Sequence, residues 1–238
     1  MAAGNKIVIA FDLYGTLLST DSIVKQLGQH FSDSKAQSIS TSWRRYQLEY
    51  TWRLNSMGQY ISFSSITRNS LRHAVAEHGE KLEDAAIDEL LKAYDSLPAF
   101  PDVDSTLSQL ANRSDITAVV FSNGTQAMVT NSVRNSPDLS PHSAVFEQIV
   151  TVDEVRQFKP APAVYAHLAQ KMGKSPSSQM GDLWLVSGNP FDVSGARSCG
   201  MHAVWVDRGR RGWMDAAVPD LQPTAVVHDL NDILTVIQ

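Results

Sequence analysis

Cysteine is almost absent from this sequence: Cys199 is the only one among 238 residues. One thiol cannot build an intrachain disulfide framework, so the fold depends on a packed core rather than on covalent crosslinks. Hydrophobic residues make up 43% of the chain, which is enough for one well-packed domain carrying a sizeable insertion, or for two modest domains. No second thiol accompanies Cys199 in the segment SGARSCGMH, and we expect it to be structural.

Long apolar runs and stretches of one charge are missing as well. The apolar runs, such as IVIAFDL and TAVVF, have the length of strands, far short of the roughly 20 residues that span a membrane. The net charge of −5 comes from acids and bases mixed along the chain, without the basic stripe that binds a nucleic-acid backbone. The N-terminus shows no secretory signal pattern. We therefore expect a cytoplasmic protein that binds neither membranes nor nucleic acids.

Short apolar runs recur along the sequence and predict strands. Residues 6–13 read KIVIAFDL, a run too short for a helix of normal length and typical of a strand buried on both faces. Similar runs occupy residues 116–122, 146–150, 184–187 and 203–206. Helix-like stretches separate them, and this alternation predicts an α/β protein with a Rossmann-like, doubly wound parallel sheet. Ligands of such sheets bind beyond the carboxyl ends of the strands.

Between residues 20 and 98 the pattern changes. Apolar positions in WRRYQLEYTWRLNSM, SITRNSLRHAVAEHG and EDAAIDELLKAYDSL follow helical spacing, and no strand-like run separates them. Pro98 and Pro101 mark the return of the chain to the sheet. The sequence therefore predicts a core domain of residues 1–19 and 99–238, with an all-helical cap of residues 20–98 inserted after the first strand.

Polar clusters follow the predicted strands, and two of them supply opposite charges. FDLYGT at 11–16 places Asp12 at the end of a strand, before a glycine turn whose backbone N–H groups bind anions or orient a nucleophile. FKP at 158–160 supplies Lys159, a cation that keeps a nearby carboxylate ionised. Taken alone, Asp12 is typical of a turn and Lys159 is typical of a solvated surface charge. Together at one sheet edge they predict a carboxylate nucleophile with its counter-charge.

Two further clusters add hydrogen-bonding groups at the same edge. FSNGT at 121–125 offers a hydroxyl and an amide after the second predicted strand, at a glycine turn. VSGNPFD at 186–192 offers a hydroxyl, an amide and a second carboxylate, which could orient the lysine or a water molecule. The residues concerned are Ser122, Asn123, Ser187, Asn189 and Asp192.

In this order the four clusters resemble the haloacid dehalogenase superfamily and, within it, the L-2-haloacid dehalogenase (type II) group. The resemblance covers almost the whole chain, the cap included. SWRRYQLEYTW at 42–52 looks like the stretch that delivers an arginine to the dehalogenase active site. The resemblance implies a homodimeric hydrolase that converts an L-2-haloacid to the D-2-hydroxyacid through a covalent ester on Asp12, with inversion and without a metal ion or other cofactor.

By the same resemblance, Asp12 attacks the substrate and other residues hold and charge-balance it or bind the departing anion. Those that would hold it are Thr16, Lys159, Tyr165, Ser187, Asn189 and Asp192. Those that would receive the anion are Arg44, Asn123 and Phe191.

The small-molecule substrate would be a 2-substituted carboxylate. Ser122 and backbone amides near Tyr14 would bind its carboxylate, by resemblance to the family. An apolar wall would exclude water, which strengthens the electrostatic interactions inside the site. The side chains of this wall would be Leu48, Phe63 and Phe191.

Two positions separate this chain from the phosphatases that the superfamily also contains. Those phosphatases carry a second acid two positions after the nucleophile, where this chain has Tyr14, and more than one acid in the last cluster, where this chain has Asp192 alone. Magnesium prefers several hard oxygen ligands, so we expect no metal.

Departures from the dehalogenase pattern leave other functions open. Arg45, Tyr46, Gly188 and Pro190 stand where the dehalogenases carry different residues, and they bear on the choice of substrate. Azetidine-2-carboxylate hydrolases resemble the same group and open a strained ring by the same attack. A magnesium-dependent phosphatase for a small metabolite and a non-catalytic binding module are further alternatives.

Overall fold

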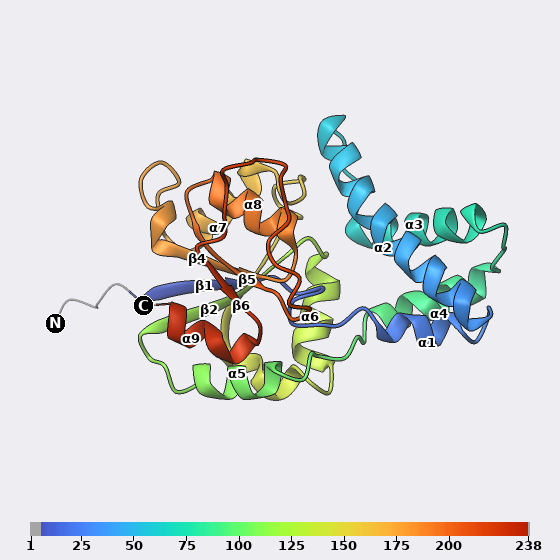
Figure 1. Ribbon diagram of the computed structural model, residues 1–238, viewed down its shortest axis with the longest axis horizontal. Helices are drawn as coiled ribbons and strands as arrows, with labels where there is room; N and C mark the ends of the chain where they lie inside the picture. The colour runs from blue at the N-terminus through green and yellow to red at the C-terminus, as the bar shows by residue number, and fades with distance from the viewer. Residues whose placement is uncertain (1–5, 238) are drawn as a thin grey trace.

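A parallel sheet forms the centre of the larger of two lobes (Figure 1). The structure is a computed structural model that describes residues 6–237. Within them the sheet has six strands in the order β3-β2-β1-β4-β5-β6, and every pairing is parallel. The strands are β1 (Ile7–Phe11), β2 (Ile116–Ser122), β3 (Phe146–Thr151), β4 (Leu183–Ser187), β5 (His202–Val206) and β6 (Ala225–Val227). The predicted doubly wound parallel sheet is confirmed.

The central place of β1 follows from its composition. Ile9, Ala10 and Phe11 have no exposed surface, because β2 and β4 flank the strand and helices cover both faces of the sheet. Strand β6 was not predicted. It has three residues, Ala225–Val227, too few for an apolar pattern to stand out.

Helices cover both sides of the sheet. In Figure 1, α7 and α8 lie on one side of the strands, and α5 and α9 lie on the other. The elements of this lobe are α5 (Val103–Leu110), α6 (Gln126–Asn135), α7 (Pro162–Lys171), α8 (Pro190–Ser198) and α9 (Ile233–Val236), with 3-10 turns η1 (Ser140–Val145), η2 (Met180–Asp182) and η3 (Leu230–Asp232).

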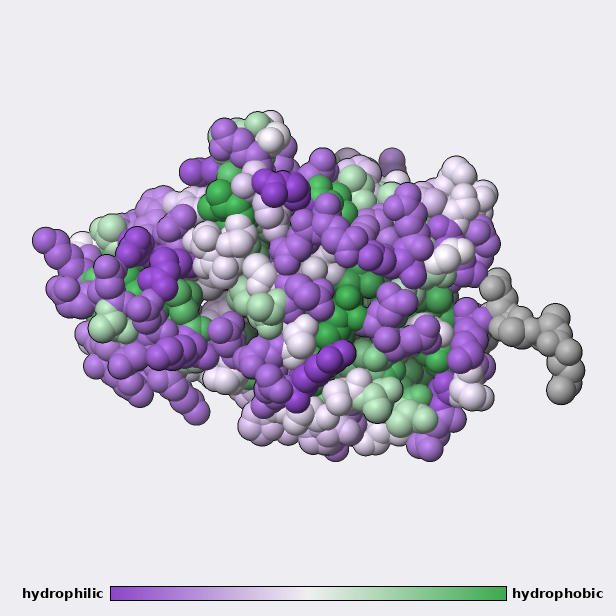
Figure 2. All heavy atoms as spheres, turned by 180° about the vertical axis from the view of Figure 1, so that it is seen from behind, coloured by the Kyte–Doolittle hydropathy of each residue, from purple (hydrophilic) through white to green (hydrophobic). Residues whose placement is uncertain are grey.

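The smaller lobe contains helices alone. It consists of α1 (Ser22–Leu27), α2 (Asp33–Ser56), α3 (Phe63–Glu77) and α4 (Asp84–Tyr94), which lie together to one side of the sheet in Figure 1. We refer to these four helices as the cap; the domain boundaries at 20 and 98 remain predictions. Of the helices in residues 6–237, none combines the length and the apolar character that crossing a membrane demands. Seen from the opposite side, both lobes present a mostly hydrophilic surface (Figure 2).

The two chain crossings between cap and core lie side by side. Leu18 and Ala99 form an antiparallel bridge, and the backbone N–H of Ser19 donates to the carbonyl of Pro98 at 2.8 Å. At the far end of α2, Asn55 makes two hydrogen bonds with the backbone of Phe158, of 2.6 and 2.9 Å. The cap is thus attached to the core at two places: at the chain crossings around Ser19 and Pro98, which we call its root, and at the C-terminal end of α2, which we call its tip.

An ion pair braces the root of the cap. Arg208 donates two hydrogen bonds of 2.8 Å to the carboxylate of Asp102, and a third of 3.0 Å to the carbonyl of Thr16 in the loop after β1. Its guanidinium lies 4.0 Å from the ring centre of Phe100, and Asp102 also accepts the backbone N–H of Leu230 at 2.9 Å. This fork-shaped pairing joins the loop after β1, the returning chain and the C-terminal segment.

We expect Asp102→Ala to lower the free energy of unfolding by about 2–3 kcal/mol, because it leaves a partly buried guanidinium and a backbone N–H without their acceptor. Urea unfolding followed by circular dichroism measures the change. Asp104→Ala is the matched control: this aspartate lies in the first turn of α5, which begins directly after Asp102, its side chain is 84% exposed, and it pairs with His142. Equal urea midpoints for the two variants would contradict the bracing role of Arg208.

Candidate active site

Asp12 follows β1 directly and lies at the carboxyl edge of the sheet. Its backbone N–H donates to the carbonyl of Val186 in β4 at 3.0 Å, so the neighbouring strand fixes the start of the loop. Gly15 then adopts a φ of +84°, a conformation that glycine reaches without strain. The side chain of Asp12 is 10% exposed, which leaves it nearly free of bulk water.

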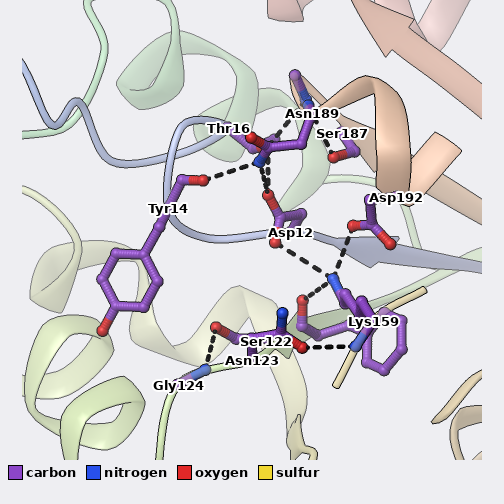
Figure 3. A network of polar contacts seen from close by, with 12 residues as sticks. Asp12, Tyr14, Thr16, Ser122, Asn123, Gly124, Lys159, Ser187, Asn189 and Asp192 are labelled. Carbon is purple, nitrogen blue, oxygen red and sulfur yellow. Dashed lines mark hydrogen bonds and ion pairs between the residues drawn. The ribbon is translucent and has the colours of Figure 1, made fainter. Parts of the chain in front are cut away.

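Three donors converge on the carboxylate of Asp12 (Figure 3). Its Oδ2 accepts from Thr16 Oγ1 at 2.8 Å and from Asn189 Nδ2 at 2.7 Å, and its Oδ1 accepts from Lys159 Nζ at 3.2 Å. A carboxylate that only accepts hydrogen bonds is stabilised in its ionised form. The arrangement therefore provides a charged carboxylate in a dry site.

Lys159 is the cation of the site, and its side chain is 1% exposed. Besides Asp12, the ammonium donates to the carbonyl of Phe121 and to Asp192 Oδ2, both at 2.7 Å. All three of its donors are used. The backbone N–H of the same residue donates to Asn123 Oδ1 at 2.9 Å. The lysine is thus fixed between two carboxylates, and residues of β2 and of the loop after it hold its ammonium and its backbone.

Asp192, on α8, is fully buried. Burial raises the pKa of its carboxyl from 3.8 to about 6, an effect that the Lys159 ammonium opposes and the charge of Asp12 reinforces. Tyr165 donates its hydroxyl proton to Asp192 Oδ1 at 2.8 Å. Burial raises the pKa of Tyr165 well above its usual value, so this hydroxyl remains a donor. Close packing of Gly195 against Tyr165 Oη, 2.3 Å from where a Cβ would lie, leaves the phenol little freedom.

The cap contributes a guanidinium to this site. Arg44, on α2, lies with Nη2 3.3 Å from Asn189 Oδ1 and 3.4 Å from the carbonyl of Tyr14. Asn189 in turn donates to Asp12, so one side chain connects the cap arginine with the carboxylate. The other terminal nitrogen of Arg44, Nη1, donates to Gln47 Oε1 at 2.7 Å.

Aromatic side chains from both lobes lie next to these polar groups. Phe63 stacks on Tyr14 with ring centres 6.0 Å apart, and Phe191 meets Trp52 edge to face at 5.6 Å. Leu48 is half-buried one helical turn after Arg44, and so shares its face of α2. The apolar wall expected from Leu48, Phe63 and Phe191 remains a prediction.

The two serines of the predicted set make local contacts. Ser122 Oγ accepts the N–H of Gly124, and Ser187 Oγ accepts the N–H of Asn189, both at 3.1 Å. Both serines are fully buried. Ser187 therefore acts on Asp12 through Asn189, whereas the substrate contact expected of Ser122 remains a prediction.

Some neighbours of the site were not singled out from the sequence. Gln47 and Tyr94 lie behind Arg44, Trp52 contacts Phe191, and the backbone N–H of Gly188 donates to Thr16 Oγ1 at 2.9 Å. A signal existed for Gln47, because a residue three positions after Arg44 lies next to it on a helix. The partners on other elements left no such signal.

Metal ligands are sparse near Asp12. Over residues 6–237, no three His, Cys, Asp or Glu side chains gather as a metal ion would require. Asp12 and Asp192, the acids of the two motifs, both bind the ammonium of Lys159.

Comparison with known proteins places these features in a family. A family model of haloacid dehalogenase-like hydrolases matches residues 8–200. Haloacetate dehalogenase H-2 of Moraxella sp. (strain B) is 34% identical over 84% of this chain and 85% of its own length. The (S)-2-haloacid dehalogenase of Pseudomonas fluorescens is 32% identical over 94% of this chain and 92% of its own.

Solved structures agree with the sequence relatives. One is the L-2-haloacid dehalogenase from Xanthobacter autotrophicus with chloropropionic acid covalently bound. It superimposes with a TM-score of 0.82 and 26% identity, over 98% of either chain.

The buried carboxyl of Asp192 gives a testable pH dependence of stability. Its pKa rises from 3.8 in the free residue to about 6 in the folded protein, so the folded state holds a proton that the unfolded chain releases. Stability contributed by this group is therefore lost as the pH rises from about 4 to about 6. We expect the loss to be on the order of 2 kcal/mol and to disappear in Asp192→Asn. Urea unfolding at pH 4.5 and 6.5 tests this; parallel pH profiles for the two proteins would refute it.

Proposed function

Because this chain belongs to the haloacid dehalogenase-like hydrolase family and, within it, to the L-2-haloacid dehalogenase group, we propose that it hydrolyses L-2-haloacids to D-2-hydroxyacids. The observation that carries the proposal is the set of contacts at Asp12. A nearly dry carboxylate is kept charged by Lys159, Thr16 and Asn189, and a cap guanidinium lies one side chain away. The relatives act on 2-haloacids and haloacetate by name.

In the first step, an oxygen of Asp12 attacks the α-carbon of the substrate. Oδ1 is the better nucleophile, because it accepts one hydrogen bond of 3.2 Å, whereas Oδ2 accepts two shorter ones. A carbon–oxygen bond forms while the carbon–halogen bond breaks, and the halide leaves with the bonding electrons. Attack from the side opposite the halogen inverts the α-carbon, and the product of this step is an aspartyl ester.

Charge moves during this step from the carboxylate to the halide. Arg44, Asn123 and Phe191 would together receive the departing anion, while Ser122 and backbone amides near Tyr14 would bind the substrate carboxylate. Groups already placed where charge develops stabilise a transition state without reorganising. The aromatic side chains would keep water from weakening these interactions.

In the second step, water attacks the carbonyl carbon of the ester. A bond forms between Cγ of Asp12 and the water oxygen, and the bond between Cγ and the original Oδ1 breaks. One oxygen of the regenerated carboxylate therefore comes from water, and the hydroxyacid leaves with the original Oδ1. One proton of the water goes to the hydroxyl of the hydroxyacid and the other is released, so that Asp12 returns as a carboxylate. Asp192, which accepts a hydrogen bond from Lys159, would orient this lysine or the attacking water. Lys159 would balance the charge throughout. We further propose that the enzyme works without a metal ion, as a homodimer in the cytoplasm.

A single turnover in H₂¹⁸O tests the covalent route. With enzyme in excess over L-2-chloropropionate, we expect the label to enter Asp12, and mass spectrometry of the peptide containing residues 7–18 locates it. Label found in the lactate of the first turnover, with Asp12 unlabelled, would mean that water attacks the substrate directly.

A substrate comparison tests the reaction class. We expect chloride release from L- but not from D-2-chloropropionate, unchanged by EDTA, and a loss of at least about 10³-fold in Asp12→Asn. Azetidine-2-carboxylate and p-nitrophenyl phosphate are assayed alongside. Ring opening in place of chloride release would identify an azetidine hydrolase, and EDTA-sensitive phosphate release a phosphatase. Activity towards none of these substrates would favour the non-catalytic binding module.

A further inference from the structure

A buried amide binds the Nη1 edge of Arg44, whereas Nη2 faces Asn189 and Tyr14. Gln47 lies one turn further along α2 and is 1% exposed. Its Oε1 accepts from Arg44 Nη1 at 2.7 Å and from the hydroxyl of Tyr94 at 3.0 Å. Its Nε2 donates to Thr67 Oγ1 at 2.8 Å. One side chain therefore connects α2, α3 and α4 behind the arginine.

The direction of these hydrogen bonds is determined. The hydroxyl of Thr67 donates to the carbonyl of Phe63 at 2.8 Å, so its oxygen is the acceptor left for Gln47. The nitrogen of the amide must then face Thr67, and its oxygen must face Arg44. A guanidinium and a phenol, which both donate, converge on that oxygen. The amide cannot turn over without placing donors against donors.

We propose that Gln47 is a positioning residue that determines how Arg44 stabilises the leaving group. It holds one edge of the guanidinium through Nη1 and leaves Nη2 on the side of Tyr14 and Asn189. Being neutral, it orients the cation without cancelling its charge. A carboxylate at the same place would attract the guanidinium away from the site and offset its charge.

This inference rests on the proposed function and adds a residue whose hydrogen bonds go to Arg44, Thr67 and Tyr94 and not to Asp12. It predicts a dependence on the leaving group that a purely structural role would not produce. Chloride is a poorer leaving group than bromide, and its departure relies more on a well-placed cation. Loss of the positioning should therefore slow the chloro substrate more than the bromo substrate.

The test measures kcat/KM of L-2-chloropropionate and L-2-bromopropionate for Gln47→Glu, since this parameter covers the steps through ester formation. We expect a fall of about 10²-fold with the chloro substrate, the size of effect seen when one preorganised group is lost. The ratio of kcat/KM for the bromo substrate to kcat/KM for the chloro substrate should rise roughly fivefold or more. The bromide concentration that inhibits the enzyme by half should rise roughly tenfold. Gln37→Glu is the control, because it makes the same change on the exposed face of α2 and should leave all three values within about twofold.

Thr67→Val tests the same idea without a buried charge. It keeps the shape of the side chain and removes the acceptor that orients the Gln47 amide, so the ratio of the two kcat/KM values should rise by about two- to threefold. The thermal midpoint should fall by roughly 3–8 °C, because the Gln47 amide and the Phe63 carbonyl each lose a hydrogen bond. This variant decides the matter if Gln47→Glu fails to fold.

The outcomes separate this inference from the proposed function. A wild-type protein that releases no halide from either substrate refutes both. Active wild-type protein with an unchanged bromo-to-chloro ratio in Thr67→Val and in folded Gln47→Glu overturns the role of Gln47 alone.

Discussion

The pairing of one buried ammonium with two carboxylates dominates this site. Burying Lys159, Asp12 or Asp192 by itself would be very costly, because a protein interior solvates isolated charges poorly. The three groups are retained together because each satisfies the others, at 3.2 and 2.7 Å. One cation does not neutralise two carboxylates. The arginine that the cap adds, close to Asn189, brings the charges of the site into balance.

The cap is therefore part of the electrostatics of the site as well as its cover. The contacts of Arg44 with Asn189 and Tyr14 measure 3.3 and 3.4 Å, long enough to shorten or lengthen with small shifts of α2. The position of that helix is fixed by Gln47 within the cap, by the Asn55 contacts at its tip and by the chain crossings at its root. Hydrogen bonds remote from Asp12 thus help to fix where the positive charge of Arg44 lies relative to Asp12.

The residues that depart from the dehalogenase pattern lie in different surroundings. Arg45 pairs with Glu77 and lies over the ring of Tyr46, which stacks on His73; these contacts are all within the cap. Gly188 lies against the nucleophile loop, where a Cβ would come within 2.5 Å of the carbonyl of Gly15. Gly188 is therefore placed to alter the shape of the site directly.

The sequence alone determined the strands β1 to β5 and the helical stretch between residues 20 and 98, because buried strands read as short apolar runs and helices repeat their apolar positions every three to four residues. It also determined the candidate residues at the strand ends, because the carboxyl ends of parallel strands lie at one edge of the sheet. Tertiary structure decided which of these residues touch. Lys159 meets Asp12 across 147 positions and Asn189 meets it across 177, whereas Ser187 contacts Asn189 instead. It also added β6 and the hydrogen bonds of Gln47 and Tyr94. Pairings between separate elements depend on how strands and helices pack, and no local period encodes that packing.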